Sequence, residues 1–65
     1  MYQVQVYEDG FGCHCSRFYR NDRDARRAFH KDFDAEEVHA IIFSTQGYRP
    51  VYEKPVGKKK FRRCV

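Results

Sequence analysis

The residues of this chain most able to do chemistry are the cysteines and the histidine of Cys13-His14-Cys15, together with a distant Cys64. Thiolate and imidazole groups bind zinc in a tetrahedron at about 2.0–2.3 Å. Residues two apart in a strand lie ~6.6 Å from one another, so both sulfurs reach one ion only if the strand bends. The C-x₂₋₄-C spacing of closed zinc sites is also missing. We therefore predict that Cys13 and Cys15 are small core residues. A zinc-stabilised domain with ligands Cys13, Cys15 and Cys64 is the lesser alternative.

The three cysteines are an odd number, whereas a small secreted protein usually carries an even set of disulfides. The expectation is reduced thiols in a cytosol, with a bridge from Cys64 to Cys13 or Cys15 as the alternative. A catalytic cysteine would need an oriented imidazole beside it, and the sequence places neither His30 nor His39 there. No phosphate-binding loop or nucleophile elbow is present. We predict a protein that is not an enzyme and has no cofactor.

The basic residues are the second group with chemical potential, and they are unevenly distributed. Residues 1–57 hold 8 Lys or Arg and 9 Asp or Glu, a balance of 8 − 9 = −1, whereas residues 58–65 hold 5 basic residues and no acidic one. Such cations can contact phosphates or a partner protein. The candidates are Arg23, Arg26, Arg27, Lys31, Lys58, Lys59, Lys60, Arg62 and Arg63. The alternatives are a solvated helix face neutralised by Asp22–Arg26 and Asp24–Arg27 pairs, and a C-terminal edge strand or frayed end kept soluble by lysines.

The elements that position these residues begin with a hairpin. Residues 2–7 alternate apolar and polar types, as a strand does, and residues 11–19 would return after a type I′ turn at Asp9-Gly10. With a two-residue loop, Val6 opposes Cys13 and Val4 opposes Cys15, which puts the valines and cysteines on one face with Phe11. The other face would carry Gln3, Gln5, Tyr7, His14, Ser16 and Phe18.

A helix over residues 22–33 is predicted next, because Asn21 is a good N-cap and Ala25, Ala28, Phe29 and Phe33 recur at helical spacing. Its other side would carry the arginines and lysine named above.

The second half of the chain reads as strands. Residues 37–45 are rich in β-branched types, the return over 48–54 follows a turn at Gln46-Gly47, and Pro50 indicates an edge position. A tight turn at residues 54–57 leads to the basic C-terminal segment 58–65, which forms a short last edge strand with Phe61 pointing inward.

The predicted fold class is therefore α+β, a single domain over residues 1–65 with the order ββαββ or ββαβββ. One helix of about twelve residues spans ~18 Å and covers only one face of a four- or five-stranded antiparallel sheet. Aromatic residues are left for the uncovered face or its rim, where they would mark an interface. They are Tyr7, Tyr48 and Tyr52, with Phe18 and Phe43, and the aliphatic Ile41 or Ile42 is left over in the same way. The alternative is that these rings wrap the edges of a very small core.

The layout resembles small phage-encoded inhibitor proteins, both host-takeover inhibitors of RNA polymerase and, more closely, a type I-F anti-CRISPR of ββαβββ order. The resemblance rests on the opening strand Tyr2–Tyr7, on the helix from Asp22 to Phe33 running directly into an apolar strand, and on the charged ending Tyr52-Glu53-Lys54…Gly57-Lys58…Phe61-Arg62-Arg63-Cys64. It covers most of the chain in layout, with almost no residue identity. It implies a non-enzymatic protein that binds a bacterial nucleoprotein complex and blocks its nucleic-acid path.

These observations lead to an expected function. The chain should be an interaction or inhibitor protein that binds a bacterial protein or nucleoprotein complex through a basic and aromatic surface. The alternative is direct nucleic-acid binding through the same cations. The start has no basic cap with an apolar run, and the longest apolar run is Ala40–Phe43, so neither a signal peptide nor a membrane partner is expected. The protein should be cytoplasmic in a bacterial host, as a monomer or homodimer.

Overall fold

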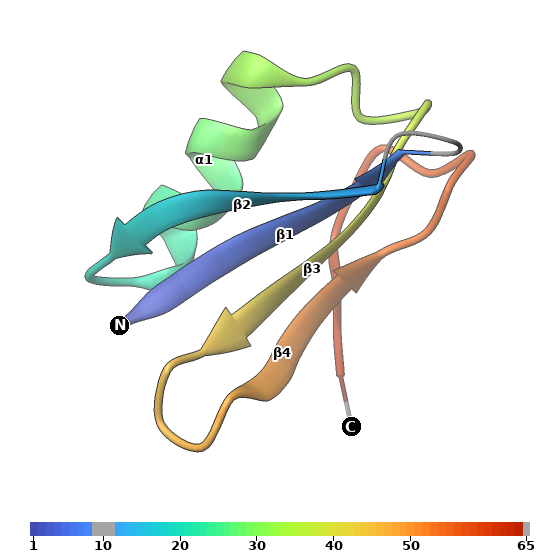
Figure 1. The fold of residues 1–65 in the computed structure, drawn as a ribbon. Coiled ribbons are helices and arrows are strands. Elements are labelled where there is room, and N and C mark those ends of the chain that lie inside the picture. Colours follow the sequence, from blue (N-terminus) through green and yellow to red (C-terminus); the bar gives the residue numbers. More distant parts are fainter. Residues whose placement is uncertain (9–11, 65) are drawn as a thin grey trace.

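A computed structural model shows one helix and a five-stranded antiparallel sheet, and it describes residues 1–8 and 12–64 (Figure 1). In Figure 1, helix α1 lies behind strand β2, on one side of the sheet. The strands lie in the order β2-β1-β3-β4-β5. This confirms the α+β class and the longer ββαβββ order. The elements are β1 (Tyr2–Glu8), β2 (Gly12–Tyr19), α1 (Asp22–Asp32), β3 (His39–Ser44), β4 (Arg49–Lys54) and β5 (Arg62–Arg63).

The register of the first hairpin differs from the prediction by one residue. Glu8 pairs with Gly12 and Tyr7 with Cys13, so three residues connect the strands. Asp9 and Gly10, the predicted turn, lie outside the described residues, as does Phe11. A shift of one residue moves every side chain of a strand to the other face. The prediction that Cys13 and Cys15 face the core with the valines is therefore wrong.

A β-bulge then restores the predicted side for the end of β2. Gln5 pairs with Cys15 and Gln3 with Phe18, so Ser16 and Arg17 together oppose Val4. The Ser16 hydroxyl accepts a hydrogen bond from the Val4 N–H at 2.9 Å, which replaces the ladder bond that the bulge removes. Phe18 consequently shares a face with Gln3, as predicted.

Helix α1 begins as its sequence indicates. The Asn21 side chain accepts a hydrogen bond from the Asp24 N–H at 2.8 Å, and acidic residues occupy the first turn. The helix ends at Asp32, one residue before the predicted end, and Phe33 is its C-cap. Ala25 and Phe29 are buried against the sheet.

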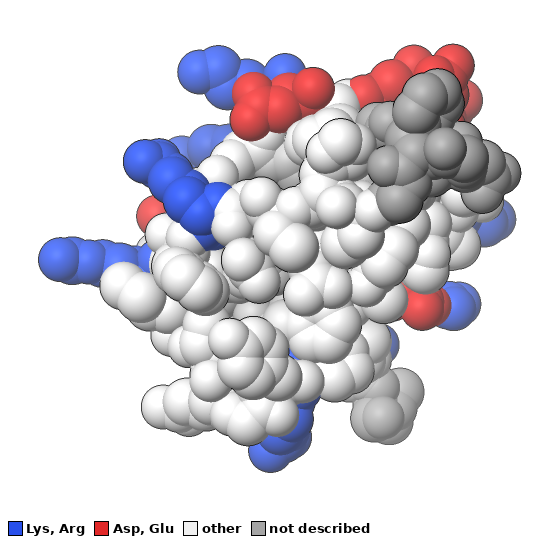
Figure 2. Space-filling view, in the orientation of Figure 1, with Lys and Arg blue, Asp and Glu red and all other residues white. Residues whose placement is uncertain are grey.

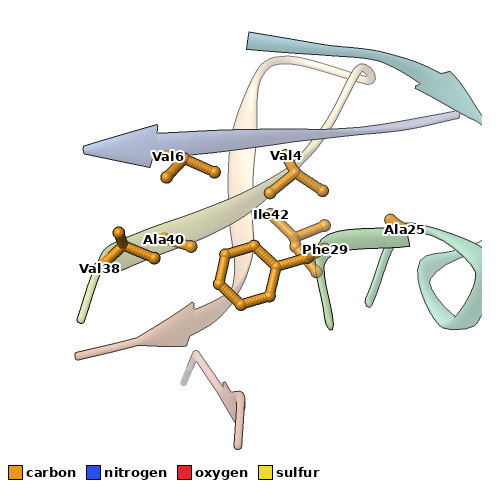
Figure 3. Close-up of a cluster of buried hydrophobic side chains, with 7 residues drawn as sticks. All are labelled: Val4, Val6, Ala25, Phe29, Val38, Ala40 and Ile42. Carbon is orange, nitrogen blue, oxygen red and sulfur yellow. The ribbon is translucent and has the colours of Figure 1, made fainter. Parts of the chain in front are cut away.

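The core lies between α1 and the covered face of the sheet (Figure 3). It is built from Val4, Val6, Ala25, Phe29, Val38, Ala40 and Ile42, all buried. Half-buried apolar residues surround this cluster, among them Phe33, Tyr52 and Phe61. The predicted valines and phenylalanines are thus present, and Ala40 and Ile42 of β3 complete the buried cluster in the absence of the cysteines.

The last third of the chain forms shorter strands than predicted. β3 and β4 are joined by a turn in which Gly47 has a φ of 76° and Tyr48 a φ of 51°, and a bulge at Val51 interrupts their pairing. β5 pairs only with Tyr52 and Glu53, so the strand at Pro50 has a neighbour on one side, as predicted for an edge. The turn after Lys54 is closed by a hydrogen bond from the Lys58 N–H to the Pro55 carbonyl.

Candidate interaction surface

The side of the sheet away from α1 carries a set of aromatic, apolar and polar side chains, here called the open face. In each strand its residues alternate with the buried ones, so the pairing identifies them. Phe18 is 50% exposed, and the other large side chains are half-buried by their neighbours. The open face consists of Gln3, Gln5, Tyr7, Cys13, Cys15, Phe18, His39, Ile41, Phe43 and Glu53.

The centre of the open face is held by contacts between β1 and β3. The Tyr7 ring stacks on the His39 ring with centroids 5.3 Å apart. The Tyr7 hydroxyl donates a hydrogen bond to Gln5 Oε1 at 2.7 Å. Burial, followed by the Cys13 thiol, raises the pKa of Tyr7, so the phenol stays protonated at neutral pH. Tyr7, a predicted binding residue, therefore lies on this face with its ring and its hydroxyl both in contact with neighbouring side chains.

At the β4–β5 end of the open face, the charges of Glu53 and Arg62 neutralise each other in an ion pair. Glu53 Oε1 accepts from Arg62 Nη2 at 2.8 Å, and His39 Nε2 lies 3.7 Å from Glu53 Oε2. The hydrogen bond from Arg62 is the main reason why the pKa of Glu53 is lowered, although burial opposes it. Arg62, predicted to bind phosphate or a partner, is thus already engaged by a carboxylate.

The other end of the open face carries two thiols. Cys13 and Cys15 are exposed and lie on the face of Tyr7 and Gln5, contrary to the prediction. Cys13 Sγ lies 3.9 Å from Gln5 Oε1. Burial and then the neighbouring Cys15 thiol raise the pKa of Cys13, and a hydrogen bond with Tyr7 only partly offsets the rise.

The third cysteine lies far from this pair. Cys64 follows β5, and its N–H donates to the Val51 carbonyl at 2.9 Å. Four strand spacings of about 4.8 Å separate β5 from β2. A disulfide needs Cα atoms within about 7 Å, so the alternative bridge from Cys64 to Cys13 or Cys15 is not formed, and all three thiols are free.

Two of the predicted binding residues belong to the covered side of the sheet. Arg26 lies over the Tyr52 ring, 4.5 Å from its centroid, and 3.4 Å from an Asp22 carboxylate oxygen. Burial alone would raise the pKa of Asp22, but the hydrogen bond from Tyr52 and the charge of Arg26 lower it overall. Tyr52 and Arg26 thus join α1 to β4, and the predicted Asp22–Arg26 pair is present.

The remaining helix cations are exposed to solvent. Arg23, Arg27 and Lys31 are exposed and make no ion pair within the described part of the chain, so the predicted Asp24–Arg27 pair is absent there. The candidates are therefore divided between the two sides of the sheet: Arg62 and Tyr7 lie on the open face, whereas Arg26 and Tyr52 lie on the covered side. The structure does not bring them together into the single surface that was predicted.

The C-terminal cations are also dispersed. Lys59 pairs with Glu36 at 3.4 Å, whereas Lys58, Lys60 and Arg63 are exposed without an ion pair among the described residues. Tyr48 is 64% exposed, but it lies in the turn between β3 and β4, at the end of the sheet.

Lys54 is a residue that sequence reasoning missed. It is fully buried, and its ammonium donates to the Pro55 and Lys58 carbonyls at 3.0 and 3.1 Å. Burial lowers the pKa of Lys54, although the charges of Asp34 and Glu36 oppose this. The alternation of side chains along a strand is a signal that could have revealed this burial. Lys54 lies two residues after Tyr52, so the two side chains share the covered side of the sheet. Lys54 anchors the loop that carries Phe61, whose ring contacts Phe29 with centroids 5.1 Å apart.

No protein-family model, curated protein or solved structure matches this chain. In the described part of the chain, no helix has the length and apolar character needed to cross a membrane.

Proposed function

We propose that this chain is a non-enzymatic binding protein and that the open face is its surface for a protein partner. The observation that carries the proposal is the exposure of Phe18 on the same face as Tyr7, Ile41 and Phe43, in a sheet that α1 covers from the other side only. Apolar patches of this kind on small proteins mark interfaces, and aromatic residues supply much of the binding energy there.

The charge of the open face favours a protein over a nucleic acid. A space-filling view from the side shown in Figure 1 has no charged side chain at its centre, Lys and Arg along its left and lower margins, and Asp and Glu along its top (Figure 2). Phosphates require cations near the stacked bases, and Arg62 is already paired with Glu53. The Tyr7 ring is stacked on His39, which leaves less of it free for a base.

The partner's chemistry follows from the same view. A complementary surface would present an apolar patch with acidic residues where the basic margin lies. The first partners to test are bacterial nucleoprotein complexes. The chain has the ββαβββ order on which its resemblance to phage-encoded inhibitors rests, and that resemblance implies such a partner.

The proposal is tested by gel filtration with purified RNA polymerase and with a type I-F CRISPR complex, using two exposed single variants. Phe18→Lys places a charge on the open face, and Arg27→Glu reverses one on the outer side of α1. We expect Phe18→Lys to abolish co-elution and Arg27→Glu to preserve it, with unchanged circular dichroism in both. Co-elution lost only in Arg27→Glu, or absent with every complex, would count against the proposal.

A second copy of this chain could cover the open face in place of a different protein. Sedimentation of the protein alone separates the two cases. A dimer that Phe18→Lys dissociates would mean that a second copy, and not a different protein, covers this surface.

Direct nucleic-acid binding is the second candidate function, and a separate observation favours it. Several exposed cations on the helix side and the C-terminal loop have no ion-pair partner in the described part of the chain: Arg23, Arg27, Lys31, Lys58, Lys60 and Arg63. Affinity for DNA or RNA that falls steeply with salt, and that Arg27→Glu weakens while Phe18→Lys does not, would support this candidate.

A further inference from the structure

We infer that Cys13 and Cys15 form a two-thiolate site for a soft monovalent metal ion of the Cu(I) type on the open face. The site does not rest on the proposed binding function. Its basis is the corrected register of β2, which places both thiols on one exposed face of one strand.

The two sulfurs are close enough to act together. Residues two apart on a strand point in the same direction, and their Cα atoms are ~6.6 Å apart. Both side chains are exposed and can turn about their Cα–Cβ bonds, so the two Sγ atoms can close on a two-coordinate ion without the strand bending that a tetrahedral ion requires. The influence of the Cys15 thiol on the pKa of Cys13 agrees with this proximity. The Cα separation that argues against a four-coordinate ion therefore does not prevent one ion from lying between the two sulfurs.

The number of donors selects the metal. Zinc in a structural site takes four protein ligands. Among the described residues, no group of three or more His, Cys, Asp or Glu side chains could hold an ion together. Thiolates prefer soft metals, and Cu(I) is satisfied by two of them in a linear arrangement. The zinc alternative from the sequence thus lacks its further ligands, whereas a two-coordinate ion needs none.

The strand itself keeps the thiols available for an ion. A disulfide requires Cβ atoms about 3.5–4.5 Å apart, which is shorter than the spacing of same-face residues in a strand. Joining Cys13 to Cys15 would therefore distort β2, while an ion placed between the sulfurs spans the wider gap.

Neighbouring groups of β1 complete the surroundings of the site. Gln5 Oε1 lies 3.9 Å from Cys13 Sγ, and the Tyr7 hydroxyl interacts with the same thiol. Such outer contacts orient metal-binding side chains. On binding, both thiols lose their protons to solvent, two S–Cu bonds form, and the oxidation state of the ion does not change.

The test is an anaerobic titration of the reduced full chain with Cu(I), in competition with the chromogenic chelator bicinchoninate and in the presence of reduced glutathione. We expect one ion per chain. Cys13→Ser and Cys15→Ser should each weaken binding by at least about 100-fold, because each removes one half of a chelate. Cys64→Ser is the matched control and should bind as the unaltered protein does.

Three results would overturn the inference. The first is that Cys13→Ser and Cys15→Ser still bind Cu(I) as the unaltered protein does. The second is that Cys64→Ser loses as much affinity as they do. The third is a stoichiometry of one ion for two chains, which would place the ion between copies. Circular dichroism of each variant verifies the fold, and the exposure of both residues makes unfolding by serine unexpected.

Discussion

Lys54 shows at the scale of one residue how a charged side chain can belong to the core of a 65-residue protein. Its aliphatic stem fills space under α1, with Nζ 5.8 Å from the centre of the Phe29 ring, while the ammonium bonds to two carbonyls of the following loop. Burying an ion is costly even when it is hydrogen-bonded. Burial is the largest cause of the lowered pKa of Lys54. The unfavourable effect of burial on the charged ammonium is therefore larger than the favourable effect of the Asp34 and Glu36 charges.

We expect Lys54→Met to unfold with an equal or higher free energy than the unaltered protein near neutral pH. The variant keeps the volume and removes the buried charge. The freed carbonyls have other partners, since the Pro55 carbonyl also accepts from the Lys58 N–H and Lys58 is exposed to water. Lys54→Ala is the control for volume and should lose about 2–5 kcal/mol through its cavity. Urea denaturation measures both.

The pH dependence has a defined sign. A lysine whose pKa is lowered by folding penalises the native state while it is charged, and the penalty is relieved as the pH rises towards the ordinary pKa of 10.5. The free energy of unfolding of the unaltered protein should therefore rise in alkaline solution as Lys54 loses its proton, and that of Lys54→Met should show no such rise. If Lys54→Met were less stable by more than about 1 kcal/mol at neutral pH, the carbonyl bonds would outweigh desolvation.

At the scale of the element, the bulge in β2 decides what the open face contains. It adds one residue opposite Val4, and therefore the two halves of β2 present their residues with opposite alternation. Cys13 and Cys15 on one side of the bulge and Phe18 on the other reach the same face. Without the extra residue, Phe18 would point to the side of the sheet that α1 covers.

Ser16→Ala should lower the free energy of unfolding by about 1–3 kcal/mol, because it leaves the Val4 N–H, in a buried residue, without the acceptor 2.9 Å away. Ser44→Ala is the matched control. Its hydroxyl accepts from the Gln46 N–H in an exposed turn, where water can replace it. Thermal unfolding of the two variants gives the comparison, and equal losses in both would show that the bulge bond contributes nothing specific.

At the scale of the whole molecule, α1 and the sheet are held together by apolar packing and by the polar contacts of Asp22 and Arg26 with Tyr52 of β4. The hydrogen bond from Tyr52 and the charge of Arg26 lower the pKa of Asp22 against the effect of burial. A carboxyl group whose pKa folding lowers stabilises the native state above its ordinary pKa of 3.8, and this stabilisation is lost as the pH falls through the folded pKa.

Tyr52→Phe should therefore destabilise the protein by about 1 kcal/mol near neutral pH, and by progressively less as acid protonates Asp22. The free energy of unfolding measured across an acid series gives this curve. Tyr48→Phe, at an exposed turn position, should have no effect at any pH. A loss in Tyr52→Phe that is independent of pH would mean that the hydroxyl acts through packing and not through Asp22.

The sequence alone was sufficient to determine those features that depend on local physics. The cap at Asn21, the stripe that buries Ala25 and Phe29, and the strand alternation around Val4 and Val6 are properties of short segments, and they led to the α+β class and to a one-sided helix. The positions of the Pro50 edge and of Phe61 followed from the same kind of reasoning.

Only the tertiary structure decided which side chains share a surface. A loop one residue longer than a type I′ turn moved Cys13 and Cys15 out of the core, and the pairing of β4 drew Tyr52 and Lys54 under the helix. Helix geometry placed Arg23 and Arg27 on the exposed side of α1, away from the open face. Register and the crossing of α1 over the sheet arise from contacts between segments distant in the chain, and periodicity within one segment does not contain them.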